Sequence, residues 1–500
     1  MISFSRDLKS FAAERKDEIA LIESRNNKSW SWAELDELVD KVGGWLRAKN
    51  IPVGKSVVAV LPNSAEALVL FLACIRYGNL LAPVTPQSTP RELKNWLDMV
   101  DPVAVVASAS AAPEIGPTMK LHLVQIDSKF EWCSKYDGGP SEIDGGSLCI
   151  PTSGTTGTPK PLVHDGSRLW ESGKRFIEYH TKAAGGRYLN NLPMSYLGGM
   201  FNLGLIPLAG GGSTVITSEF TGQSFFNYWR EIDQFQIDVL WLVPTIIRGL
   251  LAIADRMSEK DRIKIGKKVR FAFLGTAPID LDSKIRFEKT FNIQLVENFG
   301  LSETTFITSE RLYEDKKRSE GSVGSILPYT DIKLRPFIDE EEASRKVLEV
   351  YARTPFMAKG YLQPDGTIFD PRGKDGYLAT GDLGYWDKEE NLVLTGRSRD
   401  VIKKGGLLVS LREIEVVAEG YRSIEEAAAV PITHKFYGEN AALFVQLREG
   451  GEEFVLQEFQ KYLAFNLSRH KLPESVTVVN ELPKTASGKI QKSVLAIKNL

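Results

Sequence analysis

The first part of the chain alternates short apolar runs with amphipathic helical patterns. Ser31 and Glu34 form a predicted capping box, and apolar residues follow at helical spacing over 35–46. The runs 56–61 and 80–84 lack polar alternation, which predicts buried strands, and each run is followed by a helical pattern. Strands of this kind separated by helices predict an α/β fold with mostly parallel sheets covered by helices on both faces.

A loop rich in glycine and threonine, residues 152–160, follows the apolar run 147–150. Ligands of parallel sheets bind outside the carboxyl ends of the strands, and this loop is expected at such an end. Its backbone N–H groups and hydroxyls suit a polyphosphate. The spacing of Gly154, Gly157 and Lys160 is not the Walker pattern, which disfavours a kinase or GTPase. On its own, the loop could equally be a surface turn of small polar residues.

Two more apolar runs, 269–274 and 293–296, are each followed directly by candidate nucleotide contacts. Small residues at 275–278 would let a flat ring lie against the backbone. Residues 297–303 bring an aromatic ring, a glycine, a hydroxyl and the Glu303 carboxylate to a place where a nucleotide and Mg²⁺ could bind. An ordinary turn with a solvated carboxylate is the alternative for this segment alone.

The end of the chain has a different pattern. Asp382 could accept both hydroxyls of a ribose and Arg397 could reach a phosphate, although a turn residue and a surface cation would look the same. A short polar joint then precedes a small α+β pattern, which predicts two domains, 1–398 and 399–500. Lys489 follows Ser-Gly in a turn and could swing its ammonium into a cleft, whereas a solvated lysine is the alternative.

Composition narrows the class of protein. A chain of 500 residues exceeds what one core usually organises, and 43% hydrophobic with 25% charged residues is typical of a soluble globular protein. The net charge of −2 gives no electrostatic reason to expect a nucleic-acid or membrane partner. Cys74, Cys133 and Cys149 lack metal-ligand spacing and suit a reducing compartment. With no predicted transmembrane segment or signal peptide, we expect a cytoplasmic protein.

Together these segments resemble the adenylate-forming superfamily, which includes acyl-CoA synthetases, luciferases and peptide-synthetase adenylation domains. The resemblance covers nearly the whole chain, and its six motifs occur in the family's order and approximate spacing. They are 153–160, 275–278, 298–303, 380–382, 396–397 and 483–489. The resemblance implies a large N-terminal domain that binds the acid and ATP, and a small mobile α+β C-terminal domain. It also implies a two-step reaction, in which an acyl-adenylate forms and a thiol then captures the acyl group.

The resemblance further implies a role for each matching residue. Those holding the ATP phosphates would be Thr152, Ser153, Gly154, Thr155, Thr156, Gly157, Thr158 and Lys160. The rest of the nucleotide site would comprise Gly275, Thr276, Ala277, Pro278, Asn298, Phe299, Gly300 and Ser302, with Asp382 on the ribose and Arg397 on the ribose or phosphate. Glu303 would hold Mg²⁺, and Lys489 would bridge the substrate carboxylate and the α-phosphate. Arg399 matches the hinge, and Lys403, Gly405 and Gly406 match the loop for the thiol step.

The acid site is the least defined part of the prediction. The aromatic-histidine pair usual in the family appears as Ser195-Tyr196, and no aspartate is present there to pair an α-ammonium. An apolar or aromatic acid is therefore expected, in a pocket suggested by family analogy to include Tyr196, Phe201, Val243, Leu301 and Phe306.

These features predict an ATP-dependent acid–thiol ligase of the acyl- or aryl-CoA synthetase type that uses ATP, Mg²⁺ and CoA. One alternative is an enzyme that loads the phosphopantetheine of a separate carrier protein. A non-catalytic sensor of nucleotide or acid is the other alternative, which the retention of Glu303, Asp382 and Lys489 disfavours.

Overall fold

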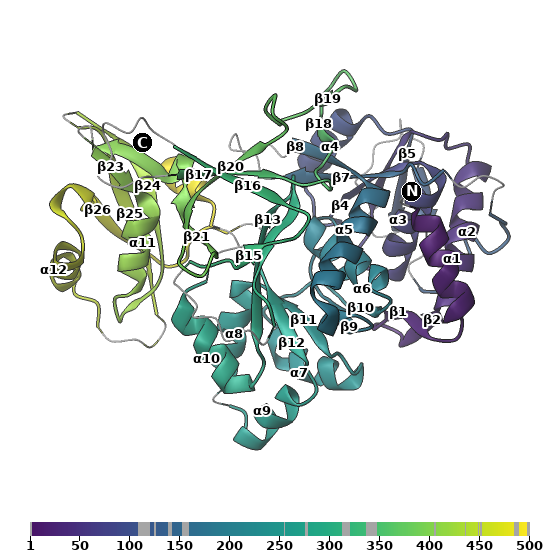
Figure 1. Ribbon diagram of the computed structural model, residues 1–500, viewed down its shortest axis with the longest axis horizontal. Coiled ribbons are helices and arrows are strands. Elements are labelled where there is room, and N and C mark those ends of the chain that lie inside the picture. Colours follow the sequence, from purple (N-terminus) through teal and green to yellow (C-terminus); the bar gives the residue numbers. More distant parts are fainter. Residues whose placement is uncertain are drawn as a thin grey trace. The chain divides into compact units, whose positions relative to one another are not determined.

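A computed structural model of the chain describes most of its 500 residues. The described ranges are 3–108, 121–124, 127–138, 143–152, 160–254, 256–275, 279–312, 321–336, 348–404, 407–435, 437–448, 450, 453–484 and 490–497. The chain forms two compact units (Figure 1). Unit 1 comprises Met1–Asp315, Leu327–Thr330 and Thr354–Pro371, and unit 2 comprises Lys316–Ile326, Asp331–Arg353 and Arg372–Leu500. The pivot predicted at Arg399 stays a prediction.

One sheet of unit 1, called sheet I, has eight strands in the order β19-β18-β8-β7-β4-β3-β5-β6. Its strands are β3 (Ser56–Val60), β4 (Leu80–Val84), β5 (Ala104–Ser108), β6 (Leu121–Val124), β7 (Ser147–Thr152), β8 (Lys160–Asp165), β18 (Gly360–Leu362) and β19 (Ile368–Phe369). The strands from β7 to β6 are parallel, and β8, β18 and β19 extend the sheet with antiparallel pairs. The predicted parallel sheet is therefore confirmed in its centre, with an antiparallel edge added.

Sheet II of unit 1 has the order β14-β13-β12-β11-β9-β10-β1-β2. Its strands are β1 (Ile19–Glu23), β2 (Lys28–Ser31), β9 (Arg187–Asn190), β10 (Ser213–Ile216), β11 (Val239–Leu242), β12 (Phe271–Leu274), β13 (Leu295–Leu301) and β14 (Thr305–Ser309). All neighbouring strands from β1 to β13 are parallel, whereas β2 pairs with β1 and β14 pairs with β13 in antiparallel fashion. β13 continues through Leu301, so the segment after Val296 is a paired strand rather than the loop that the sequence suggested.

The helices of unit 1 cover and separate these sheets. They are α1 (Phe4–Glu14), α2 (Trp32–Ala48), α3 (Ala65–Tyr77), α4 (Pro90–Val100), α5 (Gly166–Tyr179), α6 (Ile206–Ala209), α7 (Ser224–Gln234), α8 (Pro244–Ala254), α9 (Glu259–Gly266) and α10 (Leu281–Phe291). The predicted capping box of Ser31 and Glu34 is present at the start of α2. α3 is buried along its whole length, and the Arg76 guanidinium pairs with Asp36 at 2.5 Å and with Asp40 at 2.7 Å on α2.

Helix α5 lies between the two sheets of unit 1 (Figure 1). Its residues pack on β7 and β8 of sheet I. On the other side, the ring of Phe176 lies 5.1 Å from that of Phe273 on β12 and 4.5 Å from that of Phe306 on β14. This helix therefore connects the end of the glycine-rich hairpin to the end of sheet II.

Unit 2 contains two further sheets. Sheet III is antiparallel, with the order β16-β17-β20-β21, and sheet IV has the order β23-β22-β25-β24, with β26 parallel to β25. Their strands are β16 (Asp331–Pro336), β17 (Leu348–Arg353), β20 (Leu378–Trp386), β21 (Leu392–Arg397), β22 (Val401–Lys404), β23 (Leu407–Ser410), β24 (Ile424–His434), β25 (Gly438–Leu447) and β26 (Ser475–Val479). The unit also contains β15 (Ser325–Ile326), α11 (Leu411–Glu419), α12 (Leu456–Asn466) and α13 (Lys492–Ile497). The predicted α+β character of the C-terminal region is confirmed.

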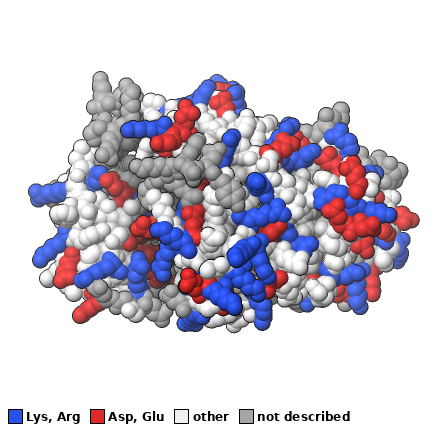
Figure 2. Space-filling model, turned by 60° about the horizontal axis from the view of Figure 1, so that its bottom comes forward, with Lys and Arg blue, Asp and Glu red and all other residues white. Residues whose placement is uncertain are grey.

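Charge on the surface is uneven although the net charge is only −2. On the face that Figure 2 displays, Lys and Arg side chains gather near the lower centre, and acidic and basic side chains are interspersed elsewhere. Among the helices in the described part of the chain, none combines the length and the apolar character needed to cross a membrane.

Candidate active site

The glycine-rich loop is closed at its base by a β-hairpin in sheet I. Thr152 at the end of β7 pairs directly with Lys160 at the start of β8, and the Thr152 hydroxyl donates to the Lys160 carbonyl at 3.1 Å. Residues 153–159, and with them Ser153 to Thr158, lie outside the described residues. β7 is parallel to β4, so the loop does leave the carboxyl end of a parallel strand, as predicted.

Tyr361 on β18 brings the hairpin and Glu303 together. Gly360 and Tyr361 pair with Val163 and Leu162 on β8, next to the start of the hairpin. The Tyr361 hydroxyl donates to Glu303 Oε1, and Lys160 Nζ lies 5.9 Å from the centre of the tyrosine ring. Burial and the nearby Glu303 carboxylate raise the pKa of Tyr361, which keeps the phenol protonated as a donor. The sequence analysis missed Tyr361 because strand β18 is three residues long and carries no periodicity.

The turn that carries Glu303 is held from several sides. The Glu303 carbonyl accepts a hydrogen bond from the N–H of Ala358 at 2.8 Å. The Thr304 side chain is fully buried, and its hydroxyl accepts from Leu301 N and donates to the Thr305 carbonyl, both at 3.1 Å. Thr305 has a φ of +59°, a left-handed conformation that is rare and strained for a β-branched residue. The turn is therefore a fixed, strained feature of the fold rather than a solvated surface loop.

His164 on β8 also contacts this turn. It is 1% exposed and makes a hydrogen bond with the backbone of Ser302. Burial lowers the pKa of His164 to about 4, so the imidazole is neutral at pH 7. His164 therefore supports the turn structurally and does not transfer a proton near neutral pH.

Gly275 directly follows the carboxyl end of β12, and it lies next to Asn298 in the middle of the adjacent strand β13. A Cβ added at Gly275 would come within 2.8 Å of Asn298 Oδ1, so a larger residue would fill this space. Asn298 is 5% exposed, and its Nδ2 has no hydrogen-bond partner among the described residues. A buried amide donor without a partner costs about 1–3 kcal/mol, and a ring nitrogen of adenine would satisfy it. Both features fit a nucleotide base, whereas Thr276, Ala277 and Pro278 lie outside the described residues.

A buried ion cluster beneath β13 was not foreseen from the sequence. Lys284 on α10 is 2% exposed, and its Nζ lies 2.9 Å from Glu297 Oε2 and 2.8 Å from Glu310 Oε1. Burial alone would lower the pKa of Lys284, but the two carboxylates outweigh it and raise it. Because Glu297 directly precedes Asn298, the cluster fixes the strand that carries the orphaned amide.

Unit 2 holds the other predicted nucleotide contacts. Asp382 on β20 and Arg397 on β21 are directly paired across sheet III, with 3.0 Å between Asp382 Oδ1 and Arg397 Nε. Asp382 is 4% exposed, and its N–H donates to the Thr380 hydroxyl at 3.0 Å. The two residues singled out from the sequence are therefore neighbours that form an ion pair with each other. Their contact with a ribose stays a prediction.

The predicted hinge and thiol-step residues lie just after this pair. Arg399 is in the short helical turn Ser398–Asp400, and Lys403 lies on β22, where its backbone pairs with Leu408. Gly405, Gly406 and Lys489 lie outside the described residues, so their roles stay predictions. Lys492 on α13, which the sequence analysis did not consider, bridges Asp400 at 3.1 Å and Glu415 at 2.8 Å.

Comparison with known proteins assigns the family. The family described as AMP-binding enzyme matches residues 8–362, and the AMP-binding enzyme C-terminal domain matches residues 413–489. The chain belongs to the AMP-binding enzyme family. The predicted resemblance and fold class are thereby confirmed.

Relatives of this AMP-binding enzyme are similar over nearly their full length. Sulfoacetate–CoA ligase from Cupriavidus necator is 25% identical, with 96% of this chain and 95% of the relative covered. Indoleacetate–CoA ligase from Aromatoleum aromaticum is 27% identical, with 92% of each covered. The crystal structure of ATP-bound MatB from Rhodopseudomonas palustris has a TM-score of 0.85 and 24% identity, covering 99% of this chain and 98% of that one. At that identity, the structural likeness supports the fold.

The residues predicted to line the acid site of this AMP-binding enzyme fall into two groups. Phe201 and Phe306 are 1% and 7% exposed, and their rings stack at 6.0 Å inside the aromatic core around α5. Val243 is buried after β11, whereas Tyr196 and Leu301 are only half-buried. The residues of the predicted wall are therefore buried or half-buried, and their contact with an acid stays a prediction.

One carboxylate near this wall was not foreseen. Burial raises the pKa of Tyr196, and the charges of Glu92 and Glu219 raise it further, so both carboxylates lie within electrostatic reach of Tyr196. Burial also raises the pKa of Glu219, which follows the carboxyl end of β10. The sequence alone does not place Glu219 near Tyr196, because the two residues are far apart in the chain.

Proposed function

We propose that this AMP-binding enzyme activates a carboxylic acid with ATP as an acyl-adenylate and then transfers the acyl group to CoA. The observation that supports this best is the joining of the Thr152–Lys160 hairpin to Glu303 through Tyr361. Relatives named as sulfoacetate–CoA and indoleacetate–CoA ligases, aligned over almost all of this chain, support CoA as the acceptor.

The charges of the site suit this reaction. A carboxylate is already ionised at pH 7 and needs no general base to attack phosphorus. Its repulsion from a phosphate charge at 4 Å is about 4 kcal/mol at an effective dielectric of 20. We assign Lys160 to the ATP phosphates and Lys489 to the bridge between the substrate carboxylate and the α-phosphate, because cations there reverse this repulsion.

Glu303 is the residue that we assign to Mg²⁺. Its carboxylate is oriented by the Tyr361 hydroxyl, and hydrogen-bonded carboxylates of this kind are typical metal ligands. Mg²⁺ would supply charge neutralisation of the phosphates. We assign Asp382 and Arg397 to the ribose, and Gly275 and Asn298 to the adenine.

An apolar or aromatic acid remains the proposed substrate, because aromatic side chains dominate the buried wall at Phe201 and Phe306. The main alternative substrate is an acid that carries a cationic group, because such a group could pair with Glu219. We place the reaction in the cytosol, since Cys74, Cys133 and Cys149 are all buried free thiols.

The experiment measures both half-reactions. Acid-dependent exchange of pyrophosphate into ATP is assayed for benzoate-type, fatty, dicarboxylic and α-amino acids, and thioester formation is then assayed with CoA and with a phosphopantetheinylated carrier protein. We expect exchange with an apolar or aromatic acid, thioester formation with CoA, and a loss of at least a hundredfold in exchange for Lys489→Ala.

Three outcomes would contradict parts of the proposal. Transfer to the carrier protein but not to CoA would identify a carrier-loading enzyme. If an α-amino acid gave the best exchange, we would assign Glu219 to pair with its ammonium group, and Glu219→Gln would test that assignment. ATP binding without exchange for any acid would identify a non-catalytic homologue.

A further inference from the structure

Residues 358–361, which lead into strand β18, contact the Glu303 turn at two places. The N–H of Ala358 donates to the Glu303 carbonyl at 2.8 Å, and the Tyr361 hydroxyl donates to the Glu303 carboxylate. The first contact fixes the backbone of Glu303, and the second fixes its side chain. The position of this segment therefore determines where the residue that we assign to Mg²⁺ is held.

Lys359, between these two contacts, ties the segment to the β7–β8 hairpin. Its N–H donates to the Val163 carbonyl on β8 at 2.7 Å. Its ammonium donates to the Ser147 hydroxyl at the start of β7 at 3.0 Å and lies 3.5 Å from Asp165 Oδ2 at the end of β8. Because Ser147 and Asp165 are themselves paired across the hairpin, this one lysine joins three strands.

The charge of Lys359 lies at an unfavourable place for a cation. Asp165 is the N-cap of α5, and its Oδ1 accepts a hydrogen bond from the N–H of Arg168 at 3.0 Å. The start of a helix carries a partial positive charge, so an ammonium beside it loses part of what it gains from the carboxylate. Helix stability alone therefore does not explain a lysine here, whereas the alignment of β18 with the hairpin does.

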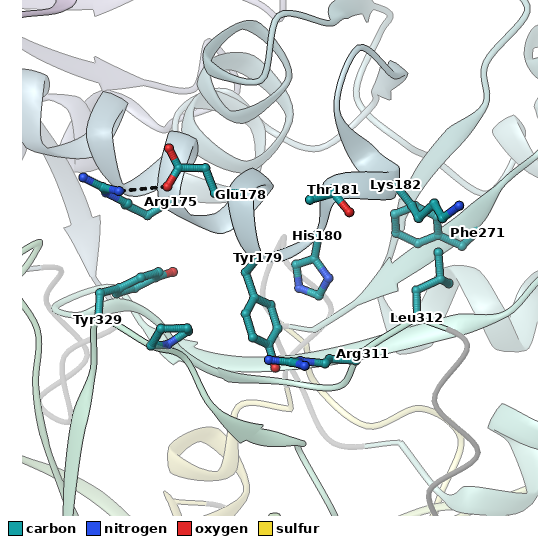
Figure 3. A pocket seen from close by; sticks show the side chains of 11 residues that line it. Arg175, Glu178, Tyr179, His180, Thr181, Lys182, Phe271, Arg311, Leu312 and Tyr329 are labelled. Atoms are coloured by element: carbon teal, nitrogen blue, oxygen red, sulfur yellow. Dashed lines mark hydrogen bonds and ion pairs between the residues drawn. The ribbon is translucent and has the colours of Figure 1, made fainter.

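An ordinary surface pair on the same helix differs from this arrangement. Arg175 and Glu178 line a cavity near the other end of α5, and the dashed line in Figure 3 joins them at 2.9 Å. Both side chains are more than half exposed, and both belong to one helix, so the pair contributes little and aligns no second element. The Lys359 ammonium is less exposed and reaches Ser147 across 212 positions of the chain.

We propose that Lys359 is a positioning residue for Mg²⁺ binding. It fixes residues 358–361 against the hairpin, so that the Tyr361 hydroxyl and the Ala358 N–H hold Glu303 in place for the metal. This rests on the proposed function, because it takes Glu303 as the Mg²⁺ ligand. Lys359 acts through Glu303 and contacts neither ATP nor the metal.

The test compares Lys359→Met, which has a side chain of similar length without the charge, with Lys359→Arg, which keeps the charge. Calorimetry measures ATP binding over a range of Mg²⁺ concentrations, and acid-dependent pyrophosphate exchange is assayed over the same range. Lys359→Met should raise the half-maximal Mg²⁺ concentration about threefold to tenfold. This is less than for Tyr361→Phe, because Lys359 lies one contact further from the metal.

Three features distinguish this role from a general loss of structure. Exchange by Lys359→Met should approach that of wild type at saturating Mg²⁺, and Lys359→Arg should recover most of the wild-type Mg²⁺ dependence. Combined with Tyr361→Phe, Lys359→Met should add less than its separate effect, because both act through Glu303. Ser147→Ala, which removes only the hydroxyl acceptor, should shift the Mg²⁺ dependence in the same direction by a smaller factor.

Lys174→Met is the matched control. Lys174 also lies on α5 and pairs with Asp7 at 2.7 Å with a comparably exposed side chain, but it joins α5 to α1. Its loss should lower stability in urea unfolding without changing the Mg²⁺ dependence.

The outcomes separate this inference from the proposed function. An unchanged Mg²⁺ dependence in Lys359→Met, an equal shift in Lys174→Met, or no recovery in Lys359→Arg would each overturn the role of Lys359. Wild-type protein that binds ATP with Mg²⁺ but exchanges no pyrophosphate would contradict the proposed function alone. Wild-type ATP binding that is independent of Mg²⁺ would contradict the assignment of Glu303 and, with it, that of Lys359.

Discussion

Gly300 provides a sharp test of how the Glu303 turn is built. A Cβ at this position would lie 1.8 Å from the Thr305 carbonyl oxygen, a backbone atom that cannot rotate away. Ordinary contact begins at 3.4 Å, so Gly300→Ala would force β13 and β14 apart locally by roughly 1.6 Å, the difference between the two distances. The displaced residues would include Thr305, whose left-handed backbone closes the turn after Glu303.

Two magnitudes follow from this displacement. Forcing one extra methyl group into a well-packed site costs about 1–3 kcal/mol of the free energy of unfolding. A misplacement on the order of 1 Å at a reacting site can cost about a hundredfold in rate. We therefore expect Gly300→Ala to lose about a hundredfold in pyrophosphate exchange, together with a moderate loss of stability.

Gly222→Ala is the matched control, because a Cβ there would meet no atom within 4 Å. It should change the free energy of unfolding by less than about 0.5 kcal/mol and leave exchange intact. The assays are urea unfolding and acid-dependent exchange on both variants and the wild type. Wild-type exchange by Gly300→Ala would refute the claim that close packing of β13 against Thr305 sets the position of Glu303.

Two further predictions concern the support of this turn. Tyr361→Phe should raise the Mg²⁺ concentration for half-maximal exchange about 10-fold to 100-fold, because Glu303 loses its orienting donor; an unchanged Mg²⁺ dependence would remove Tyr361 from the site. His164 has a folded-state pKa of about 4 against 6.5 unfolded, so its contribution to stability is full above pH 6.5 and is lost as pH falls toward 4. Between pH 7 and pH 4, the free energy of unfolding of His164→Gln should fall by up to about 3 kcal/mol less than that of wild type. Parallel pH profiles of the two proteins would contradict this.

The fold was predictable where local signals agree with tertiary packing. The capping box of Ser31 and Glu34 and the uninterrupted apolar runs of β3 and β4 each specify one element without help from distant residues. The strand at 297–301 was not predictable, because Asn298 and Gly300 have low strand propensity and are held there by pairing with β14. Tertiary contacts override local preference at that point.

Candidate site residues could be chosen from the sequence where one segment carries the chemistry, as at Glu303 and Asp382, and their roles stay predictions. The supports of the site could not be found in the same way, because each is a contact between residues far apart in sequence. Tyr361 meets Glu303 across 58 positions, and nothing near either residue indicates the other. The Lys284 ion cluster and the position of Glu219 near Tyr196 are of the same kind.

Two sets of contacts inside unit 2 each lie wholly on one side of the predicted pivot at Arg399, whereas the packing of α11 against β21 spans it. Asp382 and Arg397 are paired on adjacent strands, and both precede Arg399 in the chain. The Lys492 bridge joins Asp400 and Glu415, and all three of its members follow Arg399. A rotation of the backbone at Arg399 would therefore break neither set, because each moves as a whole on its own side. The proposed ribose contacts would persist through both half-reactions, while the Lys492 bridge would keep the start of the C-terminal domain fixed to its last helix.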